Sequence, residues 1–177
     1  MMKPIFSVVA VAALAGCQMM GGGQQAEDAP RATAQLKPTQ GNKTFGEATF
    51  EQVGASRVRV IVFAQNLKPG AEHGFHIHEV GDCSAPDAMS AKGHFNPLSK
   101  PHGRPGPDSH AGDLPMLVAA KNGRAKLDVT MEGITVTPGP TSIVGRGLII
   151  HADPDDFKTQ PTGNAGARLA CGVIQPG

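Results

Sequence analysis

Short stretches in which apolar and polar residues alternate recur along the chain from about Lys43, and they predict strands. Residues 57–63 begin with strict alternation, so that one face of the extended segment is apolar and the other is charged. Residues 114–120 and 125–131 flank Asn122-Gly123, and Asn-Gly between two apolar runs indicates a hairpin. Further strands are expected at residues 73–79, 147–151 and 168–174.

Two segments, residues 81–112 and 154–167, lack such periodicity and are rich in turn-forming residues. The chain contains 23 Gly and 15 Pro among 177 residues, so tight turns are frequent and long helices are not expected. Short strands without a helical stripe predict a single all-β domain, either a sandwich or a barrel. Long loops on a compact sheet are where function is expected.

The first sixteen residues indicate an export signal, because Lys3 is followed by an apolar run too short to span a membrane stably. The run ends in Leu14-Ala15-Gly16-Cys17, which resembles a bacterial lipoprotein processing site. This implies cleavage before Cys17 and a lipid anchor on its sulfur, whereas ordinary secretion would leave a free thiol there. Residues 17–40 are rich in Gly, Gln, Ala and Pro and predict a flexible tether, with the folded domain at 41–177.

Export has consequences for charge and for the cysteines. Without Lys3 the mature chain carries 15 basic and 15 acidic side chains, and this neutrality argues against nucleic acid as a partner. The membrane is then a partner only through the lipid on Cys17. If Cys17 carries lipid, Cys83 and Cys171 remain as a pair, and an oxidising compartment predicts a disulfide between them.

Six of the seven histidines, together with one aspartate, fall in an order that predicts two adjacent metal sites. His76 and His78 are two apart on an extended segment, so their side chains share a face roughly 6.5–7 Å apart. Three imidazoles and a carboxylate in or just beyond the long loop make a complete tetrahedral set for zinc; they come from His94, His102, His110 and Asp113. With His151, these ligands are too many for one ion but fit two if one ring uses both nitrogens. Any single one of these histidines could be a solvated loop residue without a ligand role. That interpretation is poor for six histidines and a suitably spaced aspartate together.

Five ordered motifs resemble the copper,zinc superoxide dismutase family, and matches run from about Lys43 to the end of the chain. The motifs lie at residues 73–79, 81–83, 93–97, 110–114 and 163–172. The resemblance implies a Greek-key β-sandwich or flattened eight-stranded barrel with two long functional loops. It also implies conversion of superoxide to O₂ and H₂O₂ with copper and zinc as cofactors. The spacing at 81–83 and the lipoprotein start resemble the bacterial periplasmic branch, which implies an anchored enzyme protecting the cell envelope.

The resemblance also assigns the ligands. It implies copper ligation by His76, His78, His94 and His151, and zinc ligation by His94, His102, His110 and Asp113. His94 would therefore bridge the two ions, and we expect it to relay a proton to superoxide when copper is reduced.

Other residues match supporting roles in the family. Arg168 matches the arginine that guides the anionic substrate, and Asp155 matches the carboxylate that links His76 to His102. Cys83 and Cys171 match the family disulfide. His73 matches a structural histidine that is hydrogen-bonded near the copper site without being a ligand.

Three other functions are weaker interpretations. A metal-binding module without turnover would not need all seven ligands together with Arg168, and a zinc hydrolase would need an open zinc position. A purely adhesive β-sandwich would have no use for six histidines. The chain departs from eukaryotic members at Gln160-Pro161, where those carry basic residues, so long-range steering rests on fewer charges here. The sequence leaves monomer and homodimer open.

Overall fold

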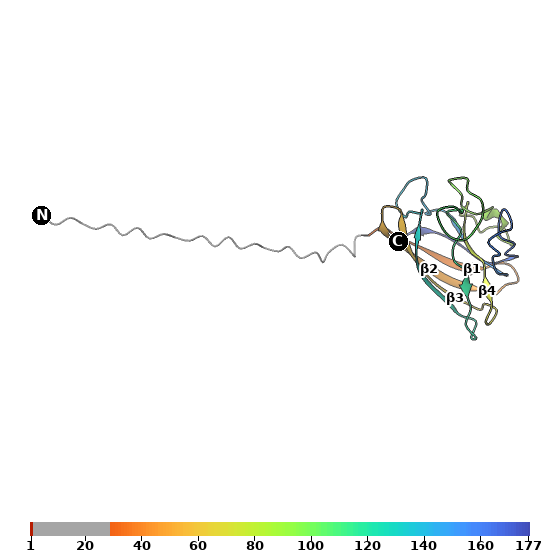
Figure 1. The fold of residues 1–177 in the computed structure, drawn as a ribbon. Coiled ribbons are helices and arrows are strands. Elements are labelled where there is room, and N and C mark those ends of the chain that lie inside the picture. Colours follow the sequence, from red (N-terminus) through yellow and green to blue (C-terminus); the bar gives the residue numbers. More distant parts are fainter. Residues whose placement is uncertain (2–28) are drawn as a thin grey trace.

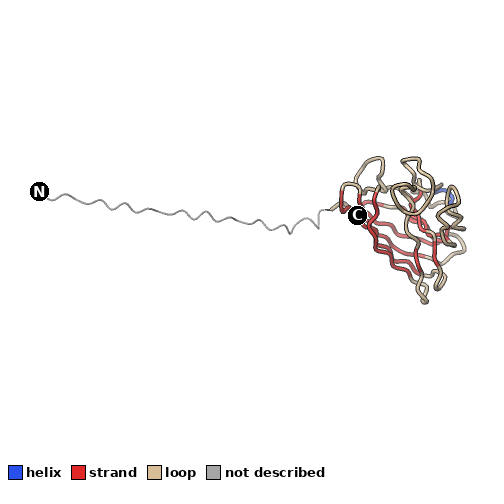
Figure 2. The backbone as a smooth tube through the Cα atoms, in the orientation of Figure 1, coloured by secondary structure: helices blue, strands red, loops and turns tan. Residues whose placement is uncertain are grey.

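The computed structural model describes Met1 and residues 29–177, in which strands connected by long loops and turns form nearly all of the regular structure (Figures 1 and 2). The strands are β1 (Arg31–Pro38), β2 (Phe45–Gly54), β3 (Arg57–Gln65), β4 (Glu72–His73), β5 (Phe75–His78), β6 (Leu117–Val118), β7 (Ala125–Glu132), β8 (Gly147–His151), β9 (Arg168–Val173) and β10 (Gln175–Pro176). Within the described residues the only helical element is a 3₁₀ turn, η1 (Met89–Ala91). The predicted signal after Met1, Cys17 and the first half of the predicted tether (residues 17–28) lie outside the described residues.

An eight-stranded antiparallel sheet forms the body of the domain, in the order β5-β8-β9-β1-β2-β3-β7 with β10 beside β1. Strands that are distant in sequence are neighbours, as in Greek-key folds, and the sheet curls around one core (Figure 1). A separate two-stranded sheet pairs β4 with β6. The predicted all-β architecture is confirmed, and no helix in the described part of the chain has the length and apolar character needed to span a membrane.

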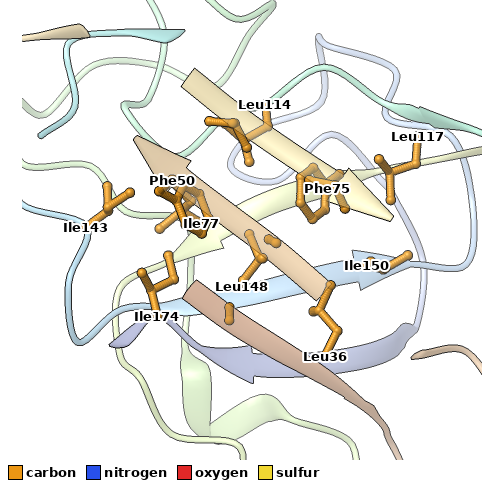
Figure 3. Close-up of a cluster of buried hydrophobic side chains, with 14 of the residues drawn as sticks. Leu36, Phe50, Phe75, Ile77, Leu114, Leu117, Ile143, Leu148, Ile150 and Ile174 are labelled. Atoms are coloured by element: carbon orange, nitrogen blue, oxygen red, sulfur yellow. The ribbon is translucent and has the colours of Figure 1, made fainter. Parts of the chain in front are cut away.

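The core follows from the alternation predicted for residues 57–63. In β3 the side chains of Val58, Val60 and Val62 are completely buried, while Arg57 and Arg59 on the opposite face are exposed. β8 differs, because all five of its residues are buried, and it therefore lies in the interior. The largest buried side chains come from several strands and meet between them (Figure 3); they include Phe50, Phe75, Ile77, Leu114, Leu148 and Ile150. Each such side chain contributes about 1.5–3 kcal/mol through burial.

The predicted tether at 17–40 is wrong for residues 31–38, which form β1 in the centre of the large sheet. Ala32, Ala34 and Leu36 point into the core, and the residues between them are exposed. The alternation is present, but two of its three apolar residues are alanines, so the segment has a tether-like composition. β1 is stabilised by pairing with β2, β9 and β10, which local composition does not reveal.

The predicted hairpin at Asn122-Gly123 is only partly correct. The turn forms, with Gly123 at φ +71° and the backbone N–H of Ala120 donating to the carbonyl of Arg124 over 2.8 Å. However, β6 pairs with β4, and β7 pairs with β3 along its whole length. The ladder between β3 and β7 includes every residue of β7 and makes it the last strand of the large sheet, whereas the two residues of β6 pair with β4 in a separate sheet.

Candidate metal centre

β5 and β8 supply three of the candidate ligands from the interior of the sheet. His76 and His78 lie on one face of β5, with ring centroids 6.3 Å apart, while Phe75 and Ile77 point into the core on the other face. The prediction that this pair shares a face is confirmed. His151 ends β8, which pairs antiparallel with β5, and its ring centroid lies 5.5 Å from that of His78. Pairing of two buried strands therefore brings these three rings together.

A closed ring of backbone hydrogen bonds fixes the long loop beside β5. The N–H of Ile77 donates to the carbonyl of Gly112 (2.9 Å), that of Gly112 to Phe95 (2.9 Å), and that of Phe95 to Ile77 (2.8 Å). A Cβ on Gly112 would collide with the carbonyl of Ile77, so this close approach requires glycine. The contact places the neighbouring residues His94 and Asp113 against β5.

All seven predicted ligands converge in two groups that share one residue. The first consists of His76, His78, His94 and His151, and the second of His94, His102, His110 and Asp113. Within each group one ligand atom per residue lies within 4.8 Å of the others, and every member is buried. These are the same two sets that the resemblance implies.

In the first group each ring uses one nitrogen as an anchor and presents the other to its neighbours. Nε2 of His76 donates to Asp155 Oδ2 over 2.6 Å. Nδ1 of His78 donates to the carbonyl of Lys92 (2.8 Å), and Nδ1 of His151 donates to that of Gly166 (3.3 Å). Because the partners in these contacts are carboxylate and carbonyl oxygens, which accept hydrogen bonds, they select the tautomer that leaves Nδ1 of His76 and Nε2 of the other two rings with a free lone pair.

In the second group three ring nitrogens converge on one carboxylate oxygen. Oδ1 of Asp113 lies 2.8 Å from Nδ1 of His94, 3.0 Å from Nδ1 of His102 and 3.3 Å from Nδ1 of His110. Its other oxygen accepts the backbone N–H groups of Gly103 and His110, each at 3.1 Å. Burial raises the pKa of Asp113, but the hydrogen bond from His94 and the other donors outweigh it and hold the pKa below the usual value. The carboxylate is therefore ionised.

His94 belongs to both groups because its two nitrogens face different neighbours. Nδ1 contacts Asp113, whereas Nε2 is buried, has no hydrogen-bond partner and faces the first group. The ring stacks on His76 with a centroid distance of 3.9 Å. A single imidazole thus lies between the two groups of donors.

The unpartnered ring nitrogens within the two groups are suited to bind metal ions. Nδ1 of His76, Nε2 of His94 and Nδ1 of His110 are buried without a hydrogen bond, a costly condition that a coordinated cation would remove. The first group offers only imidazole nitrogens, which suit copper, and the second offers three imidazoles and a carboxylate, which suit zinc.

Burial keeps the rings in the neutral form that metals require. It lowers the pKa values of His76 and His78 well below 6.5 and that of His151 to about 4, and the neighbouring His94 lowers all three further. Burial also lowers the pKa of His110. Near pH 7 these rings therefore keep their lone pairs.

Asp155 links the two groups from outside. Its Oδ2 accepts from His76, and its Oδ1 lies 2.9 Å from Nε2 of His102 and accepts the backbone N–H of Phe157 at 2.7 Å. The carboxylate thus orients one ring from each group. Gly163 packs so closely against Asp155 and His102 that a Cβ there would overlap both.

Arg168 lies beside the first group, held by the long loop. Its Nη1 donates to the carbonyl of Ala88 and its Nη2 to that of Lys92, both over 2.6 Å. The carbonyl of Lys92 also accepts from His78, so one backbone oxygen contacts both the guanidinium and a candidate ligand. The charge of Arg168 contributes to the lowered pKa of His78, consistent with this proximity.

The predicted disulfide is confirmed. Cys83 and Cys171 are bonded with a Cα–Cα distance of 5.8 Å, which ties the long loop to β9 three residues beyond Arg168. His73 lies outside both groups, and its Nδ1 donates to the carbonyl of His151 over 2.8 Å.

Two contributors were not identified from the sequence as parts of the site. The carbonyl of Lys92 acts through the backbone, at a φ of +60°, so its side-chain type carried no signal. Gln160 was recognised only as a departure from eukaryotic members, yet its amide bonds to the backbone of His102. Polar residues are common in turn-rich loops, and only the three-dimensional contact distinguishes Gln160 from its neighbours.

Comparisons with known proteins agree with this geometry. The family described as copper/zinc superoxide dismutase (SODC) matches residues 44–174. Two relatives from Aquifex aeolicus (strain VF5) are Superoxide dismutase [Cu-Zn] 1, 43% identical over 77% of this chain and 83% of the relative, and Superoxide dismutase [Cu-Zn] 2, 41% identical over 82% and 86%. Among solved structures, the clock protein EA4 superposes with a TM-score of 0.74 at 38% identity, covering 83% of this chain and 94% of that one.

Proposed function

The chain belongs to the copper/zinc superoxide dismutase family, and from this we propose that it dismutates superoxide with copper in the first group and zinc in the second. Copper, zinc and superoxide are the cofactors and substrate of such an enzyme. The observation that carries the proposed arrangement is His94, a buried ring whose two nitrogens face the two groups. It explains why two sets of four donors are built from seven residues.

Dismutation of two superoxide ions consumes two protons and yields O₂ and H₂O₂. Copper, when bound, supplies the reversible one-electron exchange that zinc, a d¹⁰ ion, cannot supply. The protein residues must then hold the ligands in place, attract an anion and deliver protons.

We assign the proton transfer to His94. Its Nδ1 can keep the ring in position on the second group while Nε2 takes up and releases a proton next to the first. Asp155 and the backbone carbonyls of Lys92 and Gly166 keep the neighbouring rings from rotating. The ring that moves the proton is therefore surrounded by rings that are fixed.

We assign attraction of superoxide to Arg168. The guanidinium stays charged, is only partly buried, and is fixed by two carbonyls beside His78, so that it presents its positive charge next to the first group. Lys158 is the only lysine or arginine in the loop at residues 154–167 that precedes Arg168, so we assign most of the local attraction to Arg168.

Arg168→Leu is therefore expected to lower kcat/KM by about tenfold at low ionic strength and to flatten its decline with added salt. Stopped-flow decay of superoxide between about 10 and 200 mM salt would measure both effects. Lys158→Leu in the neighbouring loop is the matched control, and its effect should be much smaller. An unchanged rate at low salt in Arg168→Leu would rule out the steering role.

We also propose that the enzyme is held on the periplasmic side of the bacterial cell envelope by a lipid on Cys17. The support is the sequence: an apolar run that ends in Leu14-Ala15-Gly16-Cys17. The domain would stand away from the membrane on the residues that precede β1. An exported location also agrees with the disulfide between Cys83 and Cys171. Superoxide in that compartment would be its substrate.

One experiment tests activity, metals and location together. The full chain is expressed in a bacterial host, and membrane and soluble periplasmic fractions are assayed for superoxide decay, copper, zinc and electron paramagnetic resonance. We expect activity in the membrane fraction, copper and zinc in about equal amounts, and a copper spectrum that changes when zinc is removed. Zinc without copper would contradict dismutation, a spectrum indifferent to zinc would contradict the bridge, and activity in the soluble fraction would contradict the anchor.

A further inference from the structure

The backbone of His102 is held by one side chain from another loop. The backbone N–H of His102 donates to Oε1 of Gln160 over 2.8 Å, and Nε2 of Gln160 donates to the carbonyl of His102 over 2.8 Å. His102 lies in the long loop, where no strand ladder fixes the chain, and Gln160 is 58 residues away in the Pro154–Ala167 loop. The side-chain amide of Gln160 therefore satisfies the backbone N–H and carbonyl of His102, as a neighbouring strand would do in a sheet.

The residues around this contact link the same two loops. The ring of His102 extends from the held backbone to Asp113 at 3.0 Å and to Asp155 at 2.9 Å. The guanidinium of Arg104 lies 4.8 Å from the centre of the Phe157 ring. The amide of Gln160 is the contact that acts directly on the backbone from which the imidazole projects.

We propose that Gln160 is a positioning residue of the zinc site, which holds His102 so that its Nδ1 faces the second group before the metal arrives. The proposal rests on the zinc assignment made above. A neutral amide suits this role because it can donate and accept at the same time, whereas an ionised carboxylate only accepts. Gln160 would therefore act through geometry, at the place where eukaryotic members carry charge.

The test compares Gln160→Glu, which keeps the shape but loses the donor, with Gln160→Ala, which loses both hydrogen bonds to His102. Lys158→Ala is the matched control, because it lies in the same loop and its side chain makes no hydrogen bond or ion pair within the described part of the chain. Metal-free protein is titrated with zinc against a chromophoric chelator. We expect the zinc dissociation constant to rise about tenfold in both Gln160 variants and to stay within twofold of the wild type in the control.

Substitution of cobalt(II) for zinc provides a second measurement, because its visible spectrum depends on ligand geometry. A residue that only stabilised the fold would leave this spectrum unchanged. With the site saturated, the visible absorption of the Gln160 variants should differ from that of the wild type and of Lys158→Ala, because one ligand has shifted. If Gln160→Ala does not fold, the zinc affinity and cobalt spectrum of the shape-matched Gln160→Glu variant test the proposal.

A zinc affinity within twofold of the wild type in the Gln160 variants, together with an unchanged cobalt spectrum, would overturn the positioning role and leave the dismutase assignment intact. An equal loss of affinity in Lys158→Ala would overturn it as well. A wild-type protein that takes up neither metal would instead contradict the zinc assignment, and this role with it.

Discussion

Replacing His94 with Ala is expected to lower turnover per bound copper ion by about 100-fold or more, because positioned proton donors contribute roughly 10²–10⁴ in rate. The variant removes the buried Nε2 that faces the first group and the Nδ1 that contacts Asp113. His76, His78 and His151 remain to hold copper, so metal content should fall much less than activity. Elemental analysis and superoxide decay on the same sample measure both quantities.

His110→Ala is the matched control for this result. His110 belongs only to the second group, and its ring contacts Asp113 without belonging to the copper set. Its loss should weaken zinc binding while leaving more turnover per copper than His94→Ala does. Equal losses of copper and activity in His94→Ala would reject the proton relay, and an equal effect of the two variants would assign the loss to zinc alone.

The disulfide is expected to give the largest stability effect. It closes a loop with a sequence separation of 88, for which the loop-entropy relation gives about 4.6 kcal/mol. Replacing Cys83 and Cys171 with Ser should lower the free energy of unfolding by about that amount, less any strain released in the native state. Denaturant unfolding measures it, with Cys17→Ser in both proteins so that no third thiol takes part.

Reduction provides an internal check on this prediction. A thiol reductant should bring the disulfide-containing protein to the stability of the double variant and should leave the double variant unchanged. The same treatment should make the side chain of Arg168 less firmly held, because its carbonyl partners at Ala88 and Lys92 lie in the loop that Cys83 ties to β9. A loss below about 1 kcal/mol would show that the loop is held without the bond.

The backbone carbonyl of Lys92 joins Arg168 to the first group of donors. It accepts from both Arg168 and His78 at a residue with positive φ, a conformation that is uncommon for a lysine. One oxygen therefore fixes the position of Arg168, the residue proposed to attract superoxide, relative to a ring of the first group. In the proposed enzyme, a shift of this segment would displace both.

Much of the site could be predicted because its ligands follow local rules. Two histidines separated by one residue on an extended segment must share a face, and His76 and His78 do so on β5. The continuous apolar run before His151 predicted a strand, and it is the fully buried β8. The errors arose where partners are remote: β1 has the composition of a tether but is held by three other strands, and β6 pairs with β4 instead of β7.

By itself, the sequence determined the kinds of donor atoms, their order, the family and the alternation that makes a β domain, because these depend on residue types and on spacings of a few positions. Only the tertiary structure decided which nitrogen of each ring is free, that the carbonyl of Lys92 lies between Arg168 and His78, and that Gln160 holds His102. The contacts of Lys92 and Gln160 join residues up to 76 positions apart through backbone atoms that every residue carries, so residue types alone do not indicate them.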